Sequence, residues 1–68
     1  MKVEIDYDPA VENDFAKHTS WEQVVDKYCA LSIGHEKKGK EGTSTLFFPE
    51  KIDLETLAEE LSPIKIIS

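Results

Sequence analysis

Side chains able to act as nucleophiles or proton carriers are few in this chain of 68 residues. Cys29 is the only cysteine, and the two histidines are His18 and His35. Neither histidine has a second histidine or a cysteine at the spacing that metal sites use, so we expect no metal and no cofactor. A Cys29–His35 nucleophile and base pair stays open, although the sequence offers no third group to orient it. The helical spacing of Cys29 with the apolar residues before it favours a place in the core.

Two pairs of carboxylates lie four residues apart, Glu22 with Asp26 and Glu55 with Glu59. On a helix this spacing puts both groups of a pair on one surface, where like charges repel weakly. Paired carboxylates perform acid and base catalysis when burial separates their pKa values, but we expect these pairs to be solvated. The sequence therefore predicts no enzyme. It does predict an acidic helix layer that could face a basic partner.

The charge balance argues against nucleic acid as a partner. The formal net charge is -6, and the eight basic residues are all lysines. The guanidinium fork that reads guanine and clamps phosphate is therefore absent. Lysines gather only in HEKKGKEG, residues 35–42, where Glu36 and Glu41 flank them, and we interpret this segment as a solvated turn. We expect no nucleic-acid binding; an acidic inhibitor that mimics nucleic acid stays open.

The sequence carries no signal for export or membrane insertion. A single cysteine allows no internal disulfide, which favours a reducing compartment. Residues 1–8 lack the apolar segment of a signal peptide, and no stretch approaches the roughly 18 apolar residues of a membrane span. We expect a cytoplasmic protein without membrane contact, folded as one domain over residues 1–68.

The first half of the chain changes from strand to helical periodicity. Residues 2–7 alternate polar and apolar side chains, which predicts a half-buried strand. Asp8 can cap a short helical segment over residues 9–17, which begins with a proline. Ser20 and Gln23 have the spacing of a capping box for a further helix. The apolar positions of that helix are Trp21, Val24, Val25, Tyr28 and Cys29.

The second half predicts a hairpin, a helix and a last strand. Residues 31–36 and 43–48 are strand-like and flank a turn rich in glycine and lysine. Asp53 can cap a second helix that ends before Pro63, and residues 64–68 form a short strand. The apolar positions of this helix are Leu54, Leu57, Ala58 and Leu61.

The predicted order is strand, helix, strand, strand, helix, strand. This is the βαββαβ arrangement called ferredoxin-like, an α+β fold with both helices on one face of the sheet. Its other face is then open to solvent or to a partner.

This arrangement serves many functions, so the residues must decide among them. A metal chaperone would need Cys-x-x-Cys after the first strand, and residues 6–14 contain no cysteine. A phosphatase of the acylphosphatase type would need an arginine, which the chain lacks. An RNA-recognition motif would need stacking aromatics, and only Phe47 qualifies, beside carboxylates that repel phosphate. No signature supports an amino-acid-binding regulatory module.

Phe47 and Phe48 are adjacent, so only one of them can face a one-sided core. Because Leu46 and Phe48 share a side, we expect Phe48 beneath the helices and Phe47 on the open face. The same alternation in the last strand points Ile64 and Ile66 inward and Ile67 outward. The predicted contact surface comprises Phe47, Ile67, Thr45, Lys65, Glu4 and Asp6.

These features predict a small, acidic, non-enzymatic protein-binding module that acts as a regulator, inhibitor or adaptor. It would bind another protein, or a second copy of itself as a homodimer, through the open sheet face or the acidic helices. The alternative is an enzyme or a small-ligand-binding subunit whose site forms between two copies of the chain.

Overall fold

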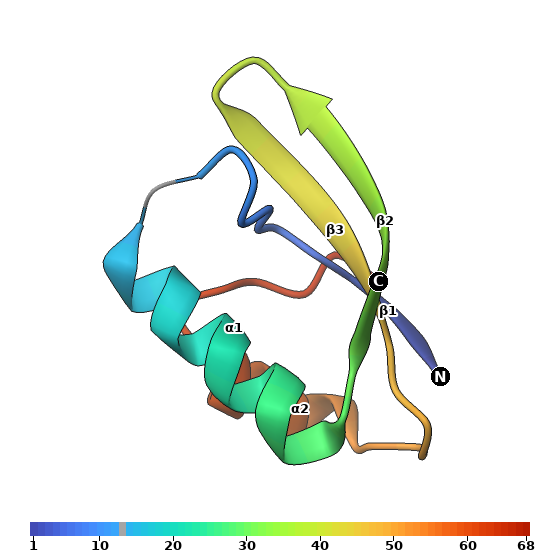
Figure 1. The fold of residues 1–68 in the computed structure, drawn as a ribbon. Coiled ribbons are helices and arrows are strands. Elements are labelled where there is room, and N and C mark those ends of the chain that lie inside the picture. Colours follow the sequence, from blue (N-terminus) through green and yellow to red (C-terminus); the bar gives the residue numbers. More distant parts are fainter. Residues whose placement is uncertain (13) are drawn as a thin grey trace.

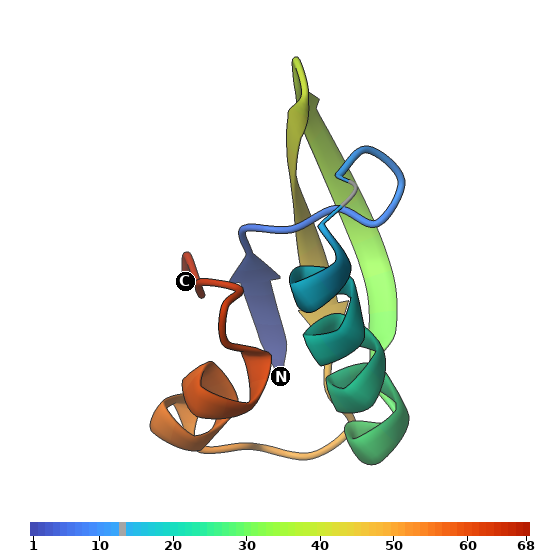
Figure 2. The same ribbon diagram turned by 90° about the vertical axis from the view of Figure 1, so that its left-hand side faces the viewer.

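The chain folds as an antiparallel sheet packed against two helices. The computed structural model describes residues 1–12 and 14–68. The elements are β1 (Lys2–Ile5), α1 (Phe15–Tyr28), β2 (Leu31–Lys38), β3 (Glu41–Phe47) and α2 (Leu54–Leu61). The three strands have the spatial order β1-β3-β2, with both pairings antiparallel. Figures 1 and 2 show α1 and α2 side by side on one side of this sheet, and no helix of the described residues covers the other side.

The predicted last strand, residues 64–68, does not join the sheet as a strand. Ile5 and Ile66 form an isolated antiparallel bridge. The amide of Glu4 donates to the carbonyl of Ser68 at 3.0 Å, so the segment follows the outer edge of β1. The amide of Ile64 is already used in a turn, donating to the carbonyl of Leu61 at 2.8 Å, so it is not available to pair with β1. The α+β class is confirmed, but the observed order is βαββα.

Helix α1 begins at Phe15, earlier than the predicted capping box. Asp14 is its N-cap, and a carboxylate oxygen of Asp14 accepts a hydrogen bond from the amide of Ala16 at 3.0 Å. An Asp side chain in this position satisfies an amide that has no partner within the helix. Ser20 lies inside the helix, and its hydroxyl donates to the carbonyl of Ser62 at 2.7 Å. The prediction that Ser20 caps the helix is therefore wrong; its hydroxyl ties α1 to the end of α2.

The segment before α1 is a turn. The carbonyl of Asp8 accepts from the amides of Val11 and Glu12 at 3.1 and 2.9 Å. The predicted helical segment over residues 9–17 is wrong in its first part, because the chain turns at residues 9–11 and the helix begins only after Asp14. Asn13, within the predicted segment, lies outside the described residues.

Two residues adopt left-handed backbone conformations where elements end. Cys29 is the C-cap of α1, with φ of 52°, and its amide donates to the carbonyl of Val25. Its side chain is exposed, so the predicted place of Cys29 in the core is wrong. Gly39, with φ of 63°, makes the turn between β2 and β3, which confirms the predicted hairpin.

The core lies between the sheet and the two helices. The prediction that Val3, Ile5, Leu46 and Phe48 face the helices is confirmed, because all four are buried. Val24 is the buried residue of α1, whereas Trp21, Val25 and Tyr28 only border the core. The buried apolar residues are Val3, Ile5, Tyr7, Val24, Ala30, Leu46, Phe48, Leu57, Leu61 and Ile64.

Strand β2 contains a bulge. Leu31 pairs with Phe47, but the register shifts between Ser32 and Gly34, which leaves Ile33 as an extra residue. A bulge of this kind changes which side of the sheet the following residues face. Leu31 precedes the bulge, and because it pairs with Phe47 it lies on the open side of the sheet beside that residue.

Candidate functional site: an uncovered sheet face

The uncovered side of the sheet brings the six predicted contact residues together. Lys2 pairs with Phe47, and Glu4 pairs with Thr45. At the outer edge of β1, the amide of Ile67 donates to the carbonyl of Glu4 at 2.8 Å. The amide of Asp6 donates to the carbonyl of Lys65 at 2.9 Å. We call this surface the open face and define it by Lys2, Glu4, Asp6, Leu31, Thr45, Phe47, Lys65 and Ile67.

An exposed cross-strand pair of apolar residues dominates the open face. Leu31 is 61% exposed and Phe47 is 36% exposed, and they lie directly opposite each other in the register. Side chains in such positions are close enough to form one continuous patch. Sequence reasoning missed Leu31 because the bulge at Ile33 interrupts the alternation. The isolated Gly34 is the signal for a bulge in this strand.

Exposed apolar side chains concentrate at this surface. Among the described residues, the large exposed ones are Phe15, Leu31, Ile33, Phe47, Leu54 and Ile67. Three of them belong to the open face, and Ile33 lies in the bulge of the adjoining strand. Only Phe15 and Leu54 lie on the helices. Single exposed apolar residues are common in proteins, but a group gathered on one sheet face indicates a contact surface.

The open face differs in charge from the rest of the molecule. Its two lysines, Lys2 and Lys65, balance the carboxylates of Glu4 and Asp6, although the chain as a whole carries -6. Helix α2, on the opposite side of the sheet, carries three glutamates and no basic residue. The open face is therefore the neutral and apolar side of an acidic domain.

A second candidate site lies along β2, between Ser32 and His35, and faces the helix side. The buried carboxylate of Asp8 lies 3.3 Å from Nδ1 of His35. Nε2 of the same ring lies 3.4 Å from the hydroxyl of Ser32, and Ser44 is 3.4 Å from Nδ1. Asp8 is thus the orienting partner for His35 that the sequence did not identify. The order of carboxylate, imidazole and hydroxyl matches that of a nucleophilic triad, although these contacts are longer than the roughly 2.6–3.2 Å of a working one.

The other histidine belongs to a separate polar cluster. Nδ1 of His18 is 2.9 Å from the buried hydroxyl of Tyr7, and its Nε2 pairs with Glu22. The His18 ring also stacks on Trp21, with centroids 5.8 Å apart. Burial raises the pKa of Tyr7 above its ordinary value, and the negative charge of Glu12 raises it further. These contacts hold β1 and its following turn against α1.

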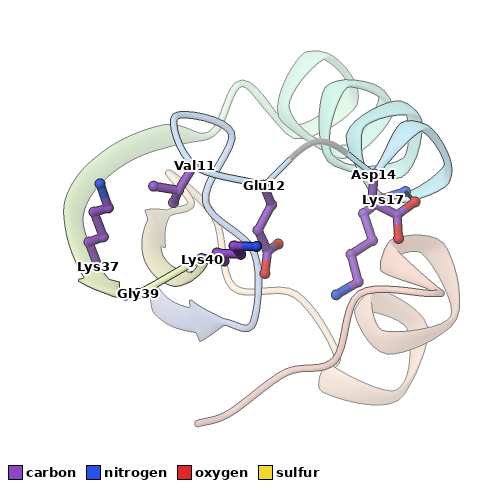
Figure 3. A pocket seen from close by; sticks show the side chains of 7 residues that line it. All are labelled: Val11, Glu12, Asp14, Lys17, Lys37, Gly39 and Lys40. Carbon is purple, nitrogen blue, oxygen red and sulfur yellow. Dashed lines mark hydrogen bonds between the residues drawn. The ribbon is translucent and has the colours of Figure 1, made fainter.

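A cleft of about 570 Å³ lies between the hairpin turn and the start of α1. Figure 3 shows Lys37 and Lys40 on the hairpin side of this cleft and Asp14 and Lys17 on the helix side. Glu12 also lines it. Two lysines of the HEKKGKEG segment therefore face a surface that also carries carboxylates. The lining thus mixes three lysines with two carboxylates and forms no purely basic surface.

Comparison with protein-family models, with curated proteins and with solved structures finds no match to this chain. Across residues 1–12 and 14–68, no helix is long and apolar enough to cross a membrane. The same residues contain no group of three or more His, Cys, Asp and Glu side chains placed to hold a metal ion. The open face and the Asp8–His35 cluster are the two candidate sites of the described residues.

Proposed function

We propose that this chain is a small non-enzymatic protein-binding module, acting as a regulator, inhibitor or adaptor, and that the open face is its contact surface. The exposed pair Leu31 and Phe47 carries this proposal. Both side chains lie on the one sheet face that no helix of the described residues covers. A partner that covers them would remove apolar area from water, and each 100 Å² so buried contributes on the order of 2.5 kcal/mol before the costs of association.

We also propose that the domain is a reduced form of the ferredoxin-like arrangement. Residues 64–68 follow the outer edge of β1, which is the position of the fourth strand in that arrangement. The isolated Ile5–Ile66 bridge and the backbone hydrogen bonds of Glu4 support this assignment. The free thiol of Cys29 fits a reducing compartment such as the cytoplasm.

The acidic helix layer is the other surface that could serve the same function. Glu22, Asp26, Glu55 and Glu59 are exposed on it. Glu60 is already paired: it accepts a hydrogen bond from Lys27 at 2.7 Å, which lowers the pKa of the Glu60 carboxyl. A basic partner held by this layer would dissociate as salt rises, whereas a partner on the apolar open face would stay bound.

Affinity capture with matched variants tests the proposed contact surface. We expect Phe47→Ser to lose the partners that the wild-type protein retains from native lysate in high salt. Leu54→Ser is the control, because Leu54 is 50% exposed but lies on α2. It should retain them, and both variants should melt near the wild-type temperature. Retention by Phe47→Ser, or equal loss from both variants, would contradict the proposal.

The Asp8–His35 cluster favours a second candidate function, an acyl-transfer enzyme or ligand-binding subunit whose site is completed by another copy of the chain. The buried Asp8 orients His35, and His35 in turn reaches the exposed hydroxyl of Ser32. Covalent labelling by a fluorophosphonate probe would test it. Labelling at Ser32 that His35→Ala abolishes and His18→Ala preserves would favour this candidate.

A further inference from the structure

We propose that the open face is covered by a second copy of this chain, in a two-fold symmetric dimer whose sheets pack face to face. This inference rests on the proposed function, because it names the partner of the same surface. Its basis is that the charges around Phe47 are of both signs and can therefore complement those of an identical surface.

A two-fold interface brings the same patch of both copies together, so the patch must be complementary to itself. Lys2 and Glu4 are alternate residues of β1 and therefore lie on the same side of the sheet, beside Phe47 and Thr45. A two-fold axis through the Phe47 region would bring Lys2 of each copy toward Glu4 of the other. A surface carrying charges of one sign would repel its own copy.

The negative net charge of the chain also favours packing of the two sheets face to face. Each chain carries a net charge of -6, so two copies repel each other unless their acidic surfaces are kept apart. Face-to-face packing places the helix layers, including the three glutamates of α2, on the two outer sides of the dimer. Toward the hairpin turn both signs of charge occur, because Glu36 and Glu41 lie among the lysines of residues 37–40. The acidic repulsion between two copies therefore comes mainly from the helix layers, and the end of the sheet around Phe47 can approach a second copy without it.

The dimer would supply the second apolar layer that so small a chain lacks. Stacked sheets lie about 10 Å apart, a gap that the side chains of their facing strands fill. Here Leu31 and Phe47 of both copies would fill the space, with Ile67 at its margin. A domain of this size buries a smaller fraction of its surface than a larger one, so a shared layer would stabilise it.

Sedimentation equilibrium over a range of protein concentrations tests this inference. We expect the wild-type chain to form a dimer that tightens as salt rises, because salt screens the repulsion between two acidic chains. Phe47→Ser should raise the dissociation constant about thirtyfold or more, the loss expected for an aromatic residue at the centre of an interface. Leu54→Ser should leave it unchanged.

Charge reversal at Lys2 and Glu4 separates specific pairing from net charge. Lys2→Glu and Glu4→Lys should each weaken the dimer, and the double variant should restore it. Net charge alone would make Glu4→Lys dimerise more tightly, because that chain is less negative. A tighter Glu4→Lys dimer would overturn the pairing and with it the face-to-face arrangement.

Two further outcomes would overturn the inference. In the first, the wild-type chain is monomeric at every concentration; if Phe47→Ser still loses captured partners, the proposed function stands and only self-association fails. In the second, Phe47→Ser dimerises like the wild type and keeps its captured partners. The proposed function and the proposed dimer would then both be contradicted. If Phe47→Ser melts early, Leu31→Ser replaces it, since Leu31 is the more exposed member of the pair.

Discussion

Phe48→Ala is expected to lower the free energy of unfolding by about 3–5 kcal/mol, which is comparable with the whole stability of a small domain. Phe48 is 0% exposed, and its ring meets Tyr28 edge to face with centroids 6.0 Å apart. Its amide donates to the carbonyl of Met1 at 2.7 Å, so the backbone holds this residue in place and limits relaxation around a cavity. Urea denaturation would measure the loss.

Phe47→Ala is the matched control for this substitution. The same atoms are removed from the neighbouring position, but the Phe47 ring is 36% exposed and lies on the open face. We expect a clearly smaller loss of stability, measured at a low protein concentration so that self-association adds nothing to it. Equal losses from the two variants would show that β3 faces the opposite way.

Gly42→Ala is expected to destabilise the chain by about 1–3 kcal/mol, although it adds only one methyl group. A Cβ atom at Gly42 would lie 2.6 Å from Cβ of Asp8 and 2.7 Å from a methyl carbon of Val11. Asp8 cannot move easily, because its carboxylate accepts a hydrogen bond from the amide of Ala10 at 2.9 Å and contacts His35. The substitution would push the turn after β1 away from the hairpin.

Gly34→Ala provides the comparison for Gly42→Ala within the same sheet. A Cβ atom at Gly34 would meet Thr45 at 3.8 Å, an ordinary contact distance. Thermal melting should therefore show little change for Gly34→Ala and a clear decrease for Gly42→Ala. If Gly42→Ala melts with the wild type, the turn after β1 does not pack against β3 as described.

The two-residue alternation of the strands predicted the direction of their side chains well. Val3 and Ile5 are buried as expected, and Phe48 faces the helices while Phe47 does not. Alternation succeeds in these strands because each has one face against the core and one in water. The hairpin turn at Gly39 was also predictable, because a glycine among charged residues is itself a local signal for a turn.

Features that depend on contacts between distant segments were not predictable. Asp14 and Ser20 are both good N-cap residues, and the choice between them depends on where the turn after β1 ends. The hydroxyl of Ser20 instead binds Ser62 on the other helix. The predicted last strand follows the edge of β1 with one isolated bridge, Ile5–Ile66, and a few backbone hydrogen bonds, and its own residues do not reveal that it fails to form a regular strand.

Strand alternation identified part of the candidate site but missed Leu31, the direct cross-strand partner of Phe47. Phe47 and Ile67 were identified by alternation alone, and both are exposed. Leu31 was missed because the bulge at Ile33 shifts the register of β2. The contact between Asp8 and His35 was missed because it joins the turn after β1 to the hairpin, which are distant in the sequence.

The most direct test of the open face is a map of amide chemical shifts of the isotopically labelled chain as it is diluted. This measurement locates the contact surface without any substitution. We predict that the shifts that change with concentration cluster at Lys2, Glu4, Leu31, Thr45, Phe47 and Ile67. Changes that cluster instead on α1 and α2 would show that the acidic helices form the contact and would contradict the account.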